Sequence, residues 1–473
     1  MKLELRPSGQ LAMAIFLVVC LSQVASAVQQ EAVTFELQEV SAFALAEESS
    51  AFGIGHRGDC ADRPETDGTT YPPFKSEEPI YGSVRLAQDP QRADGRDGVR
   101  LVFAIDESRG SGKGYDRFYL DLNGDGDLTN DRVLAKQASP PEGAAQDYAS
   151  IQQQACFEPV GIPLALRSGG TRPLEVMPRL IITDSGYRQM SFVTTRARSG
   201  QIDIAGRKLR VHLGHNYLIA GWFDRPWTAL HLIPMGQNNR AISWWEGDRL
   251  LAAHKVGGTF YRFSATPSGD RLTVRPYDGP LGTFQLGAGG RDLAAMEMSG
   301  SLVGEEIAVA IGEVSDRGRP EPLSTCRLPV GDYLPSYLTV TYGRLRINLS
   351  NNYHADGSPR DAQNRVPVYG ITIREDKPFT LDFSNEPTVL FASPAKDLRV
   401  KRGAEFTAKA VLIDPVLDVM VRGLDDTNQK QTKERTGSNG VTYSYTESLS
   451  LDPKVVISRA DGEVVAEGVM PFG

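Results

Sequence analysis

The residues with the clearest capacity for chemistry are the acidic and amide side chains of "DLNGDGDLTND", residues 121–131. Calcium takes about six to eight oxygen ligands, and a short loop supplies them when alternate side chains point inward and glycine permits a sharp bend. Four aspartates this close together repel one another unless a cation neutralises them. We therefore predict a structural calcium site formed by Asp121, Asn123, Asp125, Asp127 and Asp131.

The order of ligands in this loop follows a known pattern. Its D-x-N-x-D-G run over residues 121–126 resembles the calcium loops of EF-hands and dockerin modules. Position twelve, where those families place a bidentate acid, is Arg132 here, so Asp131 would have to replace that acid. The flanks "DRFYL" and "RVLAK" favour strands over helices, and we expect the loop to join two strands. The alternative is a set of Asx-turns in an exposed connection, without metal.

The four tryptophans fall within one segment of 24 residues, between Trp222 and Trp245. Indole rings beside carboxylates can stack on the C–H faces of a sugar while the acids bind its hydroxyls. Tryptophan is also a common core residue, and adjacent rings on a strand point to opposite faces. The sequence thus leaves two interpretations, core packing or a ligand platform, for Trp222, Trp227, Trp244 and Trp245.

Histidines in "HLGH" raise a third possibility, a metal-dependent hydrolase built on His212 and His215. Residues three apart on a strand face opposite ways, which argues against a shared metal ion. The chain contains neither G-x-S-x-G nor H-E-x-x-H, and we assign no catalytic residues. The leading prediction is a non-catalytic binding or scaffolding protein; the alternatives are a carbohydrate-binding or carbohydrate-active protein and the hydrolase.

Period-two alternation dominates the elements that would position these residues. Leu345, Ile347 and Leu349 share one face of a predicted strand, and hairpins are expected at Ala205-Gly206 and Asp461-Gly462. Helical periodicity is limited to short stretches from Glu36 and near Asp292. The 47 glycines and 29 prolines separate short strands, so we predict an all-β fold of several tandem antiparallel β-sandwich-like modules with a C-terminal immunoglobulin-like domain.

A length of 473 residues requires several hydrophobic cores. Composition and turn signals suggest a signal peptide (1–27), an irregular lead (28–80), a β module with the Asp-rich loop (81–195), a second with the tryptophans (196–300), a linker (301–326), a third module (327–390) and the immunoglobulin-like domain (391–473).

The N-terminus predicts export. Lys2 and Arg6 precede an apolar run over residues 11–21, and small residues end it at Ala27, which is the layout of a cleaved signal peptide. We therefore expect a periplasmic or extracellular protein with no integral membrane segment after cleavage. As a whole, the chain resembles exported multidomain bacterial proteins that carry single D-x-N-x-D-G loops on β scaffolds.

Charge and cysteine content limit the partners. A net charge of -8 without a basic run argues against nucleic acid and leaves a glycan or an envelope protein as the expected partner. Cys60, Cys156 and Cys326 remain after cleavage, an odd number, and are expected to be buried or free thiols.

Overall fold

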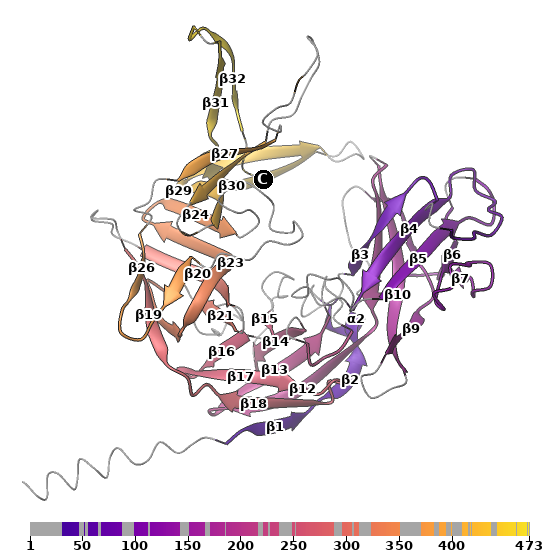
Figure 1. Cartoon of the computed structure of the whole chain (residues 1–473), viewed down its shortest axis with the longest axis horizontal. Coiled ribbons are helices and arrows are strands. Elements are labelled where there is room, and N and C mark those ends of the chain that lie inside the picture. Colours follow the sequence, from indigo (N-terminus) through magenta and orange to yellow (C-terminus); the bar gives the residue numbers. More distant parts are fainter. Residues whose placement is uncertain are drawn as a thin grey trace, which may run out of the picture.

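In the part of the chain that the structure describes, nearly all of the secondary structure is β-strand, arranged in five sheets (Figure 1). Its one α-helix in the described part of the chain is the single turn α2 (Ala42–Leu45). The computed structural model describes residues 31–472, apart from 47–51, 53–54, 65–67, 88–98, 112–113, 142–150, 166–170, 185, 216–220, 226–227, 236–247, 251, 288–295, 305–306, 312–322, 351–369, 383–386, 394–398, 400–408, 415–416, 418, 437–441, 460 and 471. The predicted all-β class with several antiparallel sheets is confirmed.

Nine strands form the first sheet, in the order β7-β6-β5-β4-β3-β11-β10-β8 with β9 paired to β10. Stacked and edge-to-face phenylalanines fill its core; the ring centroids of Phe118 lie 5.5 Å from Phe103 and 5.1 Å from Phe157. The strands are β3 (His56–Ala61), β4 (Ile80–Leu86), β5 (Val99–Asp106), β6 (Arg117–Leu120), β7 (Leu134–Ala135), β8 (Ile151–Cys156), β9 (Val160–Ala165), β10 (Thr171–Thr183) and β11 (Arg188–Thr194).

A five-stranded sheet follows, in the order β15-β14-β13-β12-β2. Its central hairpin turns at Ala205 and Gly206, both with positive φ (53° and 77°), as a type I′ turn requires. The predicted hairpin is therefore confirmed. The strands are β2 (Gln38–Ser41), β12 (Arg196–Ile204), β13 (Arg207–Gly214), β14 (Ala229–Pro234) and β15 (Asp248–Arg249).

The largest sheet has 13 strands, in the order β1-β18-β17-β16-β21-β20-β23-β24-β29-β28-β27, with β25 paired to β23 and β30 to β29. A three-stranded sheet, β22-β19-β26, packs against it around Phe284 and Leu328. The strands of these two sheets, in chain order, are β1 (Val33–Glu36), β16 (Ala252–Val256), β17 (Thr259–Ala265), β18 (Arg271–Pro276), β19 (Leu281–Leu286), β20 (Met296–Gly304), β21 (Ala308–Ile311), β22 (Thr325–Pro329), β23 (Gly331–Tyr342), β24 (Leu345–Ser350), β25 (Ile371–Ile373), β26 (Phe379–Leu381), β27 (Thr388–Ser393), β28 (Lys409–Asp414), β29 (Val419–Thr436) and β30 (Thr442–Ser450).

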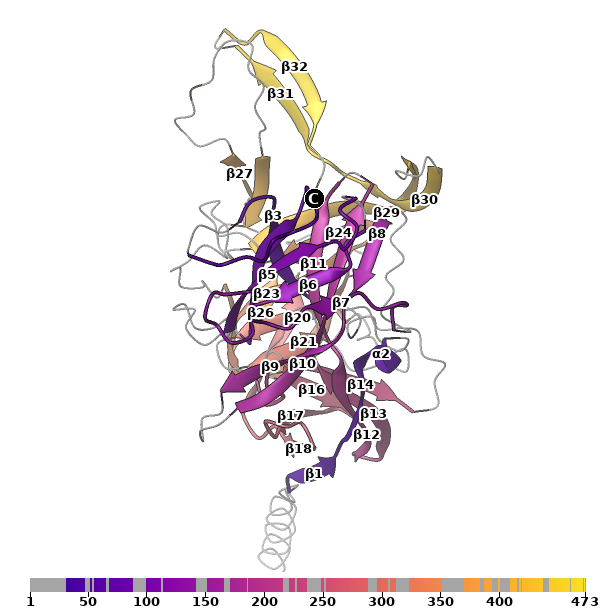
Figure 2. The same ribbon diagram turned by 90° about the vertical axis from the view of Figure 1, so that its right-hand side faces the viewer.

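A fifth sheet is the C-terminal hairpin of β31 (Lys454–Ser458) and β32 (Val464–Val469), which projects from the body (Figures 1 and 2). It turns at Gly462 with a φ of 91°, at the predicted position. Val456, Ile457, Val464 and Val469 on this hairpin are exposed.

Several strands lie where the sequence predicts irregular chain. The expected lead of residues 28–80 contains β1, β2, α2 and β3, and the helix suggested from Glu36 is reduced to four residues after a strand. The predicted linker of residues 301–326 contains β21, and β27 crosses the predicted boundary at residue 390. The second helical stretch, near Asp292, lies outside the described residues.

Backbone pairing joins the modules to one another. β1 and β2 are neighbours in sequence, yet β1 pairs with β18 of the largest sheet and β2 pairs with β12 of the five-stranded sheet. The sheets follow one another round an arc, from β3–β11 through β12–β18 to β20–β30 (Figure 1). In the described part of the chain, no helix has the length and hydrophobicity needed to cross a membrane.

Candidate functional sites

The Asp-rich loop, residues 121–131, connects β6 to β7, as predicted. Asp121 is 5% exposed and accepts from the loop backbone with both carboxylate oxygens: the N–H of Gly124 lies 2.8 Å from Oδ1, and that of Gly126 lies 3.0 Å from Oδ2. Both glycines have positive φ, 74° and 79°, which side-chain-bearing residues rarely adopt. The glycines thus allow the loop to fold back over its first carboxylate.

The next polar side chains repeat a local pattern along the loop. Asn123, Asp125 and Asp127 each accept a hydrogen bond from the backbone N–H two residues later, at 2.8–2.9 Å. Asn130 also donates to Asp125 Oδ2 at 2.8 Å, and this bond is the main cause of a lowered pKa at Asp125. Hydrogen bonds of this kind define Asx-turns, which the sequence analysis gave as the alternative to a calcium site.

Asp131 differs from the other three aspartates. Its Oδ1 accepts one long hydrogen bond from the Leu122 N–H, at 3.4 Å, and its Oδ2 is buried without a hydrogen-bond partner among the described residues. Burial raises the pKa of Asp131, and repulsion from Asp121, Asp125 and Asp127 adds to the increase. An extra carboxylate without a neutralising group therefore remains in the loop.

The donor set of the loop suits a hard divalent cation. Carboxylate oxygens that accept one N–H keep further lone pairs, and calcium prefers such ligands. Arg132, at position twelve, forms an ion pair with Glu158 and supplies no oxygen. In the conformation seen here, no three His, Cys, Asp or Glu side chains of the described residues are arranged as a metal site. Binding would thus require the carboxylates to turn toward a common centre.

A neighbouring segment anchors the loop. Thr70 donates from its N–H to the Gly126 carbonyl (2.7 Å) and accepts from the Leu128 N–H (3.0 Å). Leu128 is fully buried in an apolar cluster with Tyr119. Movement of the loop is therefore coupled to the position of residues 70–76.

Two buried acids at the end of β5 form a second constellation, which sequence reasoning missed. Asp106 and Glu107 have no exposed surface. Asp106 accepts from the backbone N–H groups of Lys75 and Ser76, with Ser76 at 2.8 Å, and Glu107 accepts from the Ser76 and Ser111 hydroxyls at 2.9 and 2.6 Å. The available signal was an apolar strand, "VRLVFAI", that ends in two consecutive acids.

Trp222 is the one predicted platform residue that the structure describes; Trp227, Trp244 and Trp245 lie outside the described residues. It is half-buried against the core of the first sheet. The guanidinium of Arg172 lies over its ring, 5.1 Å from the centroid. The ring therefore contributes to core packing and to a cation–π contact, and part of it remains exposed.

The two histidines of the proposed metal pair pack against different aromatic rings; His212 lies on β13 and His215 directly follows the last residue of that strand, Gly214. His212 lies 6.0 Å from the ring of Phe52 and bonds through Nδ1 to Ser199 Oγ at 3.0 Å. His215 stacks on Phe223 instead, with centroids 5.0 Å apart. Among the described residues, neither histidine belongs to a group of three or more His, Cys, Asp or Glu side chains that could hold a metal ion.

No family model, curated protein or solved structure matches this chain.

The three described cysteines are free thiols. Burial raises the pKa of Cys60 to about 11 and that of Cys326 to about 12, and it also raises the pKa of Cys156. A nucleophilic cysteine requires a thiolate, so none of these three is an activated nucleophile near neutral pH.

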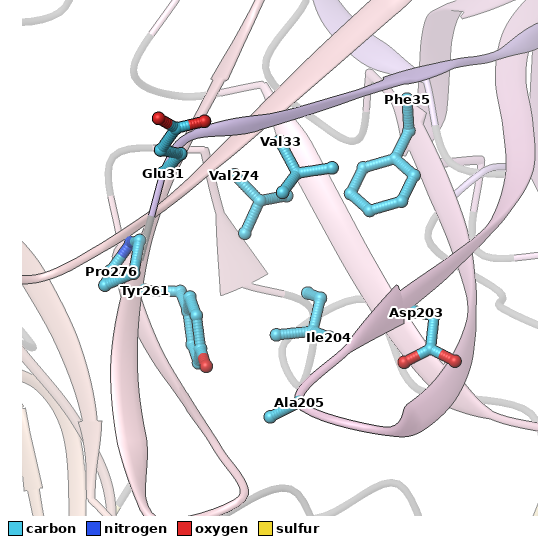
Figure 3. Close-up of a pocket in the computed structure, with 9 residues that line it drawn as sticks. All are labelled: Glu31, Val33, Phe35, Asp203, Ile204, Ala205, Tyr261, Val274 and Pro276. Carbon is cyan, nitrogen blue, oxygen red and sulfur yellow. The ribbon is translucent and has the colours of Figure 1, made fainter. Parts of the chain in front are cut away.

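A small hollow lies between β1, the β12–β13 turn and β17–β18 (Figure 3). Apolar side chains, among them Phe35 and Ile204, line it, together with the carboxylate residues Glu31 and Asp203. Its volume of about 50 Å³ is far below the roughly 300 Å³ of the smallest typical ligand pockets. We assign it no ligand.

Proposed function

We propose that this chain is an exported, non-catalytic binding or scaffolding protein of the periplasm or extracellular space, stabilised by calcium in the loop of residues 121–131. The observation that carries the scaffolding role is the backbone pairing between modules. β1 and β2 enter two different sheets, and β24 pairs with β29 across the last predicted module boundary. Such pairing favours a rigid frame that holds its loops at fixed separations.

The unpartnered oxygen of Asp131 supports the calcium proposal. A buried carboxylate oxygen without a donor is unfavourable, and three nearby carboxylates increase the cost of its charge. A divalent cation would relieve both effects. Asp121, Asn123, Asp125, Asp127 and Asp131 would hold it, and the cation would fix the loop without taking part in a reaction.

Export and the immunoglobulin-like domain are further parts of the proposal. The signal peptide, residues 1–27, rests on sequence, and sequencing of the secreted protein is expected to begin at Val28. For residues 391–473, the antiparallel run β27-β28-β29-β30 supports an immunoglobulin-like arrangement. A mature protein that retains residues 1–27 would contradict cleaved export.

Thermal unfolding in calcium and in chelator tests the calcium proposal. For a dissociation constant of about 10⁻³ M, 10 mM calcium stabilises the folded state by about 1.4 kcal/mol. Asp125→Ala should abolish this response. Asp461→Ala is the matched control, because Asp461 makes the same type of bond to the Glu463 N–H in a turn without clustered acids. If calcium does not stabilise the wild type, or stabilises Asp125→Ala to the same extent, the loop is not a calcium site.

A further inference from the structure

The C-terminal hairpin of β31 and β32 has two unlike faces. Successive side chains of a strand alternate between its faces, and residues paired across two strands share a face. One face therefore carries Lys454 and Glu467, whose Nζ and Oε2 atoms form an ion pair at 2.7 Å. The other face, which we call the apolar face of the hairpin, carries no charge and is formed by Val455, Ile457, Ala466 and Gly468.

The apolar face of the hairpin is uncovered in the described part of the chain. Ile457 is 55% exposed, and Ala466 is also exposed. A Cβ added to Gly468 would meet no atom within 4 Å. A hairpin of only two strands is marginally stable in water unless a hydrophobic face packs against another element. The hairpin therefore requires an apolar partner.

A second uncovered apolar surface lies on β27, an edge strand of the largest sheet. Leu390 packs on one face of this strand, against a buried cluster that includes Val411. Its neighbours Val389 and Phe391 lie on the opposite face and are 58% and 64% exposed. The strand has the sequence "TVLFAS", without the charged residues that usually discourage contacts at a sheet edge.

A short connection holds the hairpin away from β27 of its own chain. Only residues 451–453 join β30 to β31, and Pro453 restricts their backbone. Asp452 Oδ1 accepts from the Ser450 hydroxyl at 2.6 Å and from the Phe472 N–H at 3.1 Å, which fixes the base of the hairpin. β27 is separated from β30 by β29 and β28, and the hairpin projects from the body (Figures 1 and 2). In this arrangement, the hairpin leaves Phe391 of its own chain exposed.

We propose that two copies of the chain exchange their hairpins, so that the apolar face of each hairpin covers Val389 and Phe391 of the other copy. Both surfaces are uncharged, so their contact buries no ion, and the pair of Lys454 and Glu467 stays in water. A reciprocal exchange closes the assembly at two copies and covers both surfaces of each chain. The inference goes beyond the proposed scaffolding role and does not depend on calcium.

Sedimentation equilibrium on the chain without residues 1–27, over a range of concentrations in chelator, tests the exchange. The wild type is expected to have twice the mass of one chain. Ile457→Lys and Phe391→Glu each place a charge in the contact without a partner, and each should weaken dimerisation about 10- to 100-fold. Both side chains are exposed in the single chain, so thermal unfolding of the monomer should change little.

Two matched controls use exposed residues outside the contact. Val456→Lys adds the same charge to the adjacent residue, on the face of the hairpin that carries the ion pair, where it lies opposite Glu467. Tyr187→Glu adds a carboxylate to an exposed aromatic residue next to β11 of the first sheet. Both variants should dimerise like the wild type.

An equal mixture of Ile457→Lys and Phe391→Glu distinguishes exchange from other contacts. In a mixed dimer, the new ammonium faces the new carboxylate in one contact, and the other contact keeps the native Ile457 and Phe391. The mixture should therefore regain the dimer mass that each variant lacks alone. A wild type that stays monomeric, larger assemblies, or equal weakening by Val456→Lys would overturn the exchange. Loss of the dimer in Ile457→Lys but not in Phe391→Glu would show that the hairpins bind each other instead, and a mixture that stays monomeric would also overturn the proposal.

Discussion

The buried acids at the end of β5 and the Asp-rich loop both contain clustered carboxylates, and both rest on the segment of residues 70–76. In the first, Asp106 and Glu107 are completely buried, yet each carboxylate oxygen accepts a hydrogen bond. In the second, the loop is more exposed, yet Asp131 keeps a buried oxygen without a partner. Burial alone therefore does not distinguish a structural acid from a candidate ligand.

The difference lies in where the donors come from. Asp106 and Glu107 both receive donors from the separate segment of Lys75 and Ser76, so their charges hold the two segments together; Glu107 also accepts from Ser111, four residues further along its own segment. The loop satisfies its aspartates mainly with its own backbone N–H groups, which are too few for the last carboxylate. In the first arrangement the donors already satisfy every carboxylate oxygen, whereas the second is the loop for which we propose calcium.

The largest effect is expected at Asp106. Asp106→Ala removes the acceptor of the partly buried Lys75 N–H and of the buried Ser76 N–H, and it should lower the free energy of unfolding by about 2–4 kcal/mol. Urea unfolding measures the loss, with Asp461→Ala, in an exposed turn, as the comparison. A loss below about 0.5 kcal/mol would mean that Asp106 does not hold the two segments together.

A smaller loss is expected for Glu107→Gln. Glutamine keeps one carbonyl oxygen but presents an amide N–H₂ where the Ser111 hydroxyl and the Gly114 N–H now donate to a carboxylate oxygen. We expect destabilisation of about 1–2 kcal/mol in the same urea experiment. Unchanged stability would show that the charge of Glu107 is dispensable, and the contrast with the loop would weaken.

In chelator, Asp131→Asn should increase the free energy of unfolding, whereas the two preceding substitutions decrease it. It removes a charge that burial and three carboxylates disfavour, so the folded state should gain stability, by less than about 1 kcal/mol because the side chain is partly solvent-screened. In 10 mM calcium the same variant should lose the stabilisation seen in the wild type. Destabilisation in chelator would show that Asp131 is satisfied as it stands.

The smallest expected effect is a change in the stability of the folded protein with pH, caused by Asp131. The pKa of Asp131 is raised in the folded state, so its contribution to stability is fully present below the usual carboxyl pKa and is lost as pH rises through the raised value. In chelator, the wild type should therefore lose stability relative to Asp131→Asn over this range. Calcium should remove the difference, because a bound cation favours the ionised carboxylate. Parallel curves in chelator would contradict the raised pKa.

Local features of the fold could be predicted from the sequence. Ala205-Gly206 and Asp461-Gly462 specify hairpins because their backbone geometry restricts the turn type. Alternation places Ile347 and Leu349 in the core, and the flanks of the Asp-rich loop are strands. These features depend on neighbours within a few residues, which a single sequence records directly.

Long-range partners could not be predicted in the same way. The pairing of Val33 with Val274, or of Ser41 with Arg196, leaves no local pattern, so residues 28–80 read as irregular chain. The donors of Asp106 lie 30 and 31 residues away in the chain. The candidate ligands of the Asp-rich loop could therefore be predicted from the sequence, whereas the donors of Asp106 could not.

The pairing of β1 with β18 and of β2 with β12 also constrains when the chain can fold. When β1 and β2 leave the ribosome, their partner strands are still about 150 to 240 residues further along the chain. Assembly dominated by such distant contacts is slow. The arc therefore closes only after the middle of the chain, which carries β12 and β18, has been synthesised.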